Sequence, residues 1–88
     1  MLRRAPIPLT DLPANLAATI TDVGGRDAGI VQRLHELGFL PGERVRIVAR
    51  GPVGRDPLAV RVGDSTFALR RYEACCIRVD ADRAIVNP

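Results

Sequence analysis

The stretch Leu37-Gly38-Phe39-Leu40-Pro41-Gly42 marks the point where the periodicity of the sequence changes from helical to extended. Before it, apolar residues recur three or four positions apart after a candidate N-cap at Asp27, which predicts an amphipathic helix. Gly38 is placed to end that helix in the left-handed conformation, and Pro41-Gly42 is typical of a tight turn. After it, apolar residues alternate with arginines over residues 43–50, which predicts a strand with an apolar and a cationic face.

Short strands account for most of the remaining sequence. The predicted segments are a strand over residues 16–23, the helix, the strand over residues 43–50, a loop over residues 51–57, a hairpin over residues 58–69, a turn over residues 71–74 and a strand over residues 75–79. About five strands and one helix in 88 residues cannot leave a flat sheet with two wet faces, so we expect a small barrel. Residues 1–88 form one domain, with a loosely held lead over residues 1–8 and a tail over residues 80–88.

Composition excludes several classes of function. The formal charge is only +3, and the basic residues are arginines that are scattered among acidic residues rather than gathered in a stripe, which does not favour nucleic-acid binding. No apolar run approaches the roughly 18 residues of a membrane-spanning helix. Cys75 and Cys76 are adjacent and predict reduced thiols in the cytoplasm. In a strand their side chains point to opposite faces, which predicts Cys75 as a core residue and Cys76 as an exposed thiol.

Two longer stretches carry a resemblance to a known family. The first is Arg33-Leu34-His35-Glu36-Leu37-Gly38-Phe39-Leu40-Pro41-Gly42-Glu43-Arg44-Val45, and the second runs from Phe67-Ala68-Leu69-Arg70 through Glu73-Ala74, with Pro52, Gly54 and Asp56-Pro57-Leu58 between them. In this order they resemble the FeoA-type proteins of bacterial ferrous iron uptake. The sequence departs from that pattern at Ala14, where a glycine is common, and at Arg55, which lengthens a loop by one residue.

The resemblance implies an SH3-like barrel with the helix between the first two strands. It also implies a noncatalytic, cytoplasmic accessory protein that binds and modulates the FeoB-type iron transporter, through its cytosolic G-protein domain or its membrane region. Two alternatives remain open: a regulatory module related to metal-dependent transcription regulators, which carry similar domains, and a small nucleic-acid-binding barrel. A homodimer is also left open. Polyproline recognition is not expected, because the sequence has no Trp and one Tyr.

The candidate partner-binding residues combine the apolar turn with the cationic strand faces. They are Leu37, Phe39, Leu40, Arg44, Arg46 and Arg61. Arg50 and Arg78 are expected on the same cationic face, and the competing interpretation is a solvated face whose arginines pair with acidic neighbours.

No cofactor is expected. One chain does not offer the ligands of a closed metal site, although His35 and Glu36 remain candidates for a divalent ion shared between two molecules. Catalysis finds no support, because the single histidine has no nucleophile at a readable spacing.

Overall fold

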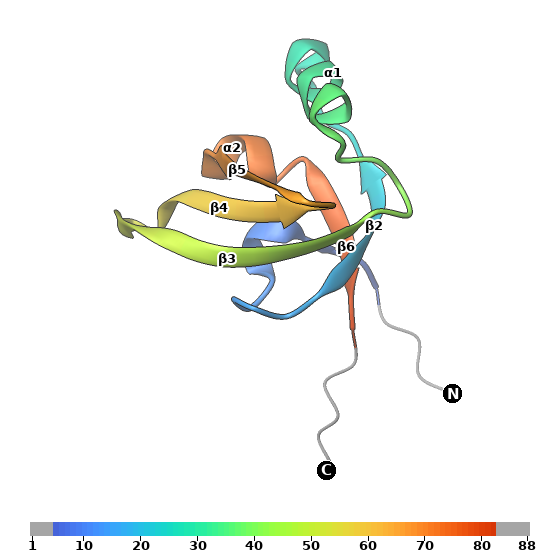
Figure 1. Cartoon of the computed structure of the whole chain (residues 1–88). Coiled ribbons are helices and arrows are strands. Elements are labelled where there is room, and N and C mark those ends of the chain that lie inside the picture. Colours follow the sequence, from blue (N-terminus) through green and yellow to red (C-terminus); the bar gives the residue numbers. More distant parts are fainter. Residues whose placement is uncertain (1–4, 83–88) are drawn as a thin grey trace.

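In the computed structural model, which describes residues 5–82, one sheet of six antiparallel strands curls around an apolar core (Figure 1). The elements are β1 (Ile7–Pro8), the 3₁₀ helix η1 (Leu9–Asp11), β2 (Ala18–Val23), α1 (Ala28–Leu37), β3 (Arg44–Val53), β4 (Asp56–Val62), β5 (Ser65–Leu69), α2 (Arg71–Ala74) and β6 (Ile77–Ala81). The strand order is β1-β6-β2-β3-β4-β5, so the sheet is not closed by pairing of its two edge strands. The predicted fold class, mainly β with one main helix in an SH3-like arrangement, is confirmed.

The sixth strand comes from the N-terminal segment. Ile7 pairs with Val79 and Pro8 with Arg78, so these residues belong to the sheet rather than to a loose lead. The C-terminal strand reaches Ala81, so the expected tail starts later than residue 80. Residues 1–4 and 83–88, where the rest of the expected lead and tail falls, lie outside the described residues.

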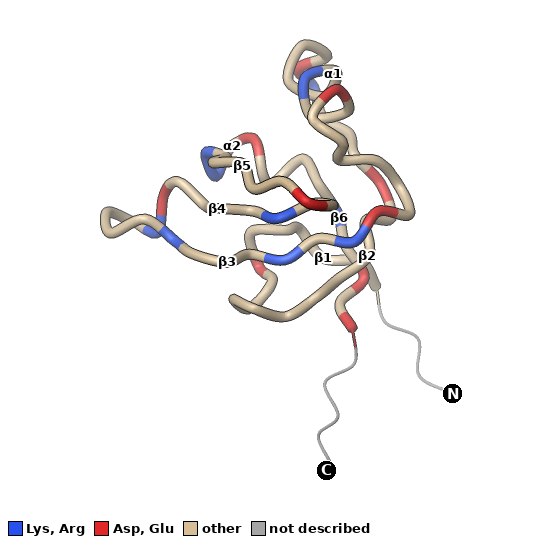
Figure 2. The backbone as a smooth tube through the Cα atoms, viewed as in Figure 1, with Lys and Arg blue, Asp and Glu red and all other residues tan. Residues whose placement is uncertain are grey.

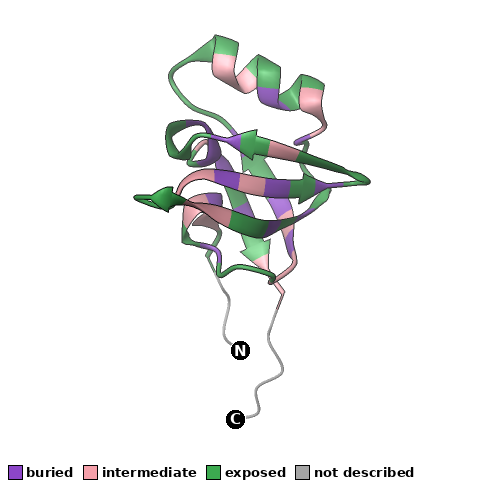
Figure 3. Ribbon diagram, turned by 60° about the vertical axis from the view of Figure 1, so that its left-hand side comes forward, coloured by how far each residue is buried: buried purple, intermediate pink, exposed green. Residues whose placement is uncertain are grey.

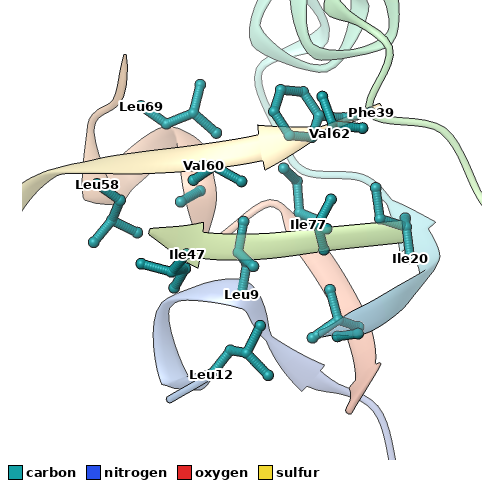
Figure 4. Packing of buried hydrophobic residues seen from close by; sticks show 14 of the residues in the cluster. Leu9, Leu12, Ile20, Phe39, Ile47, Leu58, Val60, Val62, Leu69 and Ile77 are labelled. Carbon is teal, nitrogen blue, oxygen red and sulfur yellow. The ribbon is translucent and has the colours of Figure 1, made fainter. Parts of the chain in front are cut away.

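The core is built from aliphatic side chains on the inner face of the curled sheet (Figure 4). At the start of β3 and at the end of β4, buried residues alternate with more exposed ones as the sequence predicts (Figure 3). In β3 the alternation stops after Ile47, where the register with β4 shifts, and Ala49 is exposed rather than on the predicted apolar face. Leu9 and Leu12 close the core from the segment around η1, and Phe39 enters it from the turn after α1. Their burial explains why the N-terminal part of the described chain packs along the barrel.

The limits of α1 agree with its sequence signals. The Asp27 carboxylate accepts hydrogen bonds from the backbone N–H groups of Gly29 at 2.9 Å and Ile30 at 3.2 Å. Gly38 ends the helix with φ of 107°, in the left-handed region that favours glycine. Leu34 is the fully buried side chain of the helix, which stands beside one end of the barrel (Figure 1).

The predicted loop over residues 51–57 is wrong. β3 continues to Val53 and β4 begins at Asp56, so the two strands form a long hairpin. Gly51 makes this possible, because a Cβ atom there would lie 2.3 Å from the carbonyl oxygen of Asp56. The glycines and prolines that suggested a loop occupy a stretch where the β3–β4 register shifts, and such irregular strand pairing tolerates them.

The last strand begins and ends two residues later than predicted. A four-residue helix, α2, replaces the expected turn, and Cys75 is its C-cap rather than a strand residue. Cys75 is therefore exposed and Cys76 is half-buried, the reverse of the prediction. Their thiols do not point to opposite faces, because both lie near the carbonyl oxygen of Tyr72, at 3.1 Å and 3.7 Å.

Candidate interaction surface

The turn after α1 divides its apolar side chains between the core and the surface. Phe39 is fully buried and meets the ring of Phe67 edge to face, with centroids 5.9 Å apart. Leu40 is 41% exposed and Leu37 is half-buried. The prediction that Phe39 itself contacts a partner is therefore wrong, and its role is to anchor the turn that presents Leu40.

This turn is held by backbone hydrogen bonds to β2. The N–H of Gly42 donates to the carbonyl of Ile20 at 2.8 Å, and the N–H of Ile20 donates to the carbonyl of Glu43 at the same distance. Within the turn, the N–H of Glu43 donates to the carbonyl of Leu40 at 3.0 Å. Leu40 is thus presented by a fixed backbone, which lowers the entropic cost of ordering it in a complex.

The predicted arginines of β3 and β4 meet around one hollow. Arg44, Arg46 and Arg61 line a depression of about 330 Å³. The other residues around it are Ala17, Gly42, Glu43, Val45 and Gly63. Because Gly42 belongs to the turn that carries Leu40, the apolar turn and the cationic hollow are neighbours, as the candidate site requires.

Arg44 is already matched by an acid. Its guanidinium donates to both carboxylate oxygens of Asp82, at 2.9 Å and 2.6 Å, and also donates to the hydroxyl of Thr19. The hydrogen bond to Asp82, and then the charge of that carboxylate, raise the pKa of Arg44. The positive charge of Arg44 is therefore largely balanced within the domain.

Arg46 and Arg61 differ from Arg44 in this respect. They are directly opposite each other in the register of β3 and β4, and both are exposed. Figure 2 shows basic positions along both of these strands. Within residues 5–82, neither side chain has an ion pair or hydrogen bond to an acid. Like charges placed directly opposite each other destabilise a sheet. This pair is therefore the strongest unbalanced cationic feature of the predicted site.

The other arginines expected on this face lie elsewhere. Arg78 is on β6, opposite Asp22 and two strands away from β3. Arg50 donates to the carbonyl of Leu12 at 2.7 Å, and its buried Nε atom has no acceptor among the described residues. Curling of the sheet and the register shift in the long hairpin thus split the predicted cationic face.

A second hollow, of about 1030 Å³, was missed by the sequence reasoning. Arg50, Arg55 and Arg71 line it together with Asp11 and the segment that follows. Arg55 sits at the tip of the β3–β4 hairpin with φ of 61°, a left-handed conformation that is uncommon outside glycine. In the sequence, the extra residue Arg55 was the one signal of this second hollow. The prediction of a loop over residues 51–57 did not show that Arg55 lies at the tip of a hairpin.

An ion pair between a buried carboxylate and a partly exposed guanidinium connects the two helices. Glu73 is only 7% exposed, and one of its carboxylate oxygens accepts from the backbone N–H of Arg70, the residue before the first turn of α2. Its other oxygen accepts from the guanidinium of Arg33 on α1. This contact fixes α1, and hence the turn that follows it, against the rest of the barrel.

The candidate metal ligands are both on the surface. His35 and Glu36 are exposed on α1, and Glu36 accepts a hydrogen bond from the side chain of Gln32 at 3.3 Å. Residues 5–82 contain no group of three or more His, Cys, Asp or Glu side chains placed to hold a metal ion.

Burial, followed by the charge of Cys75 and a hydrogen bond with it, raises the pKa of the Cys76 thiol.

These features define a small SH3-like domain whose surface combines a fixed apolar turn with a cationic hollow. The FeoA domain family matches residues 7–81, and the chain belongs to this family. In the part of the chain that the structure describes, no helix has the length and apolar character needed to cross a membrane.

Known relatives support this assignment. The crystal structure of FeoA from Stenotrophomonas maltophilia complexed with zinc, described as a procaryotic SH3 domain protein, is 46% identical, with a TM-score of 0.75 and coverage of 88% of this chain and 91% of that one. The solution structure of iron(II) transport protein A from Clostridium thermocellum is 31% identical, with a TM-score of 0.77 over 85% of this chain and 45% of that one.

A relative in Porphyromonas gingivalis joins two proteins in one chain. It is an Fe(2+) transport protein A/Fe(2+) transporter FeoB fusion protein, 35% identical over 72 residues. The match covers 82% of this chain and 8% of the fusion protein. A manganese-dependent transcriptional repressor is also similar, with a TM-score of 0.78 at 18% identity, which shows the fold alone.

Proposed function

We propose that this protein is a noncatalytic accessory of ferrous iron uptake that binds a FeoB-type transporter on its cytoplasmic side and modulates it. The fused relative carries this proposal, since it holds an FeoA domain and FeoB in one chain. Fusion raises the effective concentration of two modules for each other, and this advantage is useful where the modules interact. The free thiols of Cys75 and Cys76 are in keeping with a cytoplasmic location.

The proposed contact surface is centred on Leu40, with Leu37 beside it and the cationic hollow along one side. Protein interfaces combine an apolar centre with a polar rim, and arginine is enriched in them. Leu40 supplies an exposed apolar group on a fixed turn, and Arg46 and Arg61 supply unbalanced charge. No cofactor is required for binding of this kind.

The competing function, nucleic-acid binding, requires a continuous cationic surface, which the arginines of residues 5–82 do not form. Six of them line two separate hollows, Arg78 lies on β6, and Arg44 is matched by Asp82. Each phosphate contact on a duplex adds to affinity, so binding needs several cations along one track. The hollow beside the turn offers two unbalanced arginines and an acid, Glu43, which fits an acidic protein surface better than a polyanion.

Calorimetric titration against the soluble G-protein domain of the cognate transporter tests this proposal. We expect Leu40→Asp to weaken binding at least about tenfold, because it places a charge at the apolar centre of the interface. Val53→Asp is the matched control, since Val53 is 80% exposed at the far end of the β3–β4 hairpin. Equal affinities for wild type and both variants would place the interface elsewhere.

A further inference from the structure

The two edges of the sheet are protected very differently. β1 is two residues long and contains Pro8, a short edge of the kind that discourages pairing. At the other edge, β5 has the sequence Ser65-Thr66-Phe67-Ala68-Leu69, without charge, proline or register shift. Within residues 5–82, β5 pairs only with β4. An unprotected edge of this length is a template for an added strand.

The hairpin between β4 and β5 determines which backbone groups face outward. Gly63 opens its two-residue loop with φ of 57°, as such tight hairpin loops require. The pair flanking the loop, Val62 and Ser65, exchanges both hydrogen bonds, and hydrogen-bonded and non-hydrogen-bonded pairs then alternate. The N–H and C=O groups of Thr66 and Ala68 therefore point away from β4, and both residues are exposed.

The unbalanced arginines lie in line with this edge. Arg46, Arg61 and Thr66 are successive partners across β3, β4 and β5, so they form one row on the sheet. A residue added opposite Thr66 would extend the row by one position. Its Cβ atom would be two strand spacings, about 9.6 Å, from that of Arg61. The side chains of an arginine and a glutamate, both extended, are together long enough to span this distance.

We propose that the free edge of β5 accepts an extended segment of a partner protein as an added strand, with an acidic side chain opposite Thr66 directed toward Arg61 and Arg46. The edge presents alternating donors and acceptors, which a peptide backbone matches and a nucleic-acid backbone, having phosphate acceptors, does not. An acidic side chain that reaches Arg61 from two strands away attracts both arginines, so it offsets the repulsion between them. This inference deepens the proposed function and rests on it only for the identity of the partner.

A peptide probe tests the edge independently of the transporter. The probe is a blocked peptide with β-branched residues on both sides of a central glutamate, and the control has lysine at the centre. In an NMR titration we expect the glutamate peptide to slow hydrogen exchange at Thr66 and Ala68, leave exchange at Phe67 unchanged, and bind about two- to fivefold more tightly than the lysine peptide. Uniform or absent changes along β5 would overturn the proposal.

Variants separate the edge from the charge. Ala68→Pro removes one outward N–H without breaking a bond to β4, whereas Ala68→Thr retains it, so only the proline variant should lose the peptide. Arg61→Glu should reverse the preference between the two peptides. Loss of peptide binding in both Ala68 variants, or an unchanged preference in Arg61→Glu, would contradict the model of strand addition.

The same variants distinguish this inference from the proposed function. If the wild-type protein binds the peptide but not the transporter domain in any nucleotide state, the proposed partner is wrong and the strand site stands. If the transporter domain binds wild type and Ala68→Pro equally and leaves exchange at Thr66 and Ala68 unchanged, the interface does not use this edge and the inference fails.

Discussion

Removal of the Glu73 carboxylate should cost more stability than any other surface or capping change in this domain. Glu73→Ala deletes the hydrogen bond by which its carboxylate caps the backbone N–H of Arg70, worth about 0.5–2 kcal/mol. It also deletes the hydrogen bond from Arg33, whose charge-assisted contribution of about 1.5–3 kcal/mol must be reduced because the Arg33 side chain is 56% exposed. We therefore expect a loss of about 2–3 kcal/mol in the free energy of unfolding.

Urea and thermal unfolding followed by circular dichroism measure this loss. For a domain of this size the expected decrease in Tm is about 10–20 °C. Arg33→Ala is the control, and it should cost less than about 1 kcal/mol, because it leaves the hydrogen bond between the Arg70 N–H and Glu73 intact and the guanidinium is 56% exposed. The double variant should be little worse than Glu73→Ala alone. If Glu73→Ala costs no more than Arg33→Ala, the hydrogen bond from the Arg70 N–H to the Glu73 carboxylate does not stabilise the domain.

Three further changes test separate parts of the structure. Gly51→Ala should destabilise the domain by about 1–3 kcal/mol in urea unfolding, because the new Cβ meets the opposite strand's backbone, whereas Gly54→Ala meets no atom within 4 Å and strains only the turn. Leu34→Ala should cost about 2–5 kcal/mol in the same assay, since Leu34 is the buried contact of α1. Iodoacetamide labelling followed by mass spectrometry should show that Cys75, which is exposed, is modified before Cys76. Labelling of Cys76 should increase only at pH above the usual thiol range, because the pKa of its thiol is raised. Equal labelling rates of the two cysteines near neutral pH would contradict this order.

The raised pKa of Cys76 also predicts a direction for stability at high pH. A thiol whose pKa is higher in the folded state stays protonated there while the unfolded chain ionises. Its contribution to stability is therefore complete below the unfolded pKa and is lost as pH rises through the folded pKa. Cys76→Ser should lessen the decrease in stability at alkaline pH.

The sequence predicted correctly those elements that are determined by residues close together in the chain. The N-cap at Asp27 and the C-cap at Gly38 define α1 by side-chain and backbone conformations within one turn of the chain, and both agree with the structure. The sequence also predicted that, in the turn after α1, one apolar residue fills the core and another remains exposed. Which one does so depends on the direction in which the turn enters the barrel.

Longer-range contacts could not be predicted in the same way. Gly51 reads as a loop residue until the opposite strand is known to approach it, and the edge strand at Ile7 depends on pairing with residues far along the chain. The cysteines were misplaced because α2 and the turn after it occupy the positions before Ile77, so neither cysteine lies in β6. Ile77 and Val79 keep the buried face that the sequence predicted for them.

For the candidate site, the sequence predicted the arginines that share the hollow but not the acids near them. Arg44 is balanced by Asp82, which comes from the opposite end of the chain, and Arg78 is carried away by the curl of the sheet. The distinction between balanced and unbalanced arginines is therefore a property of the tertiary structure. It leaves Arg46 and Arg61 as the pair with the clearest capacity to bind an acidic partner.

The most direct test of the central claim is a titration of the transporter's soluble G-protein domain with the Arg46→Glu/Arg61→Glu double variant at low and moderate salt. We predict at least about a tenfold loss of affinity and a weaker salt dependence than in wild type, because the variant removes the unbalanced charge beside Leu40. Arg78→Glu, on a distant strand, should bind as wild type does. Unchanged affinity in the double variant, or an equal loss in Arg78→Glu, would contradict binding through the turn and the hollow.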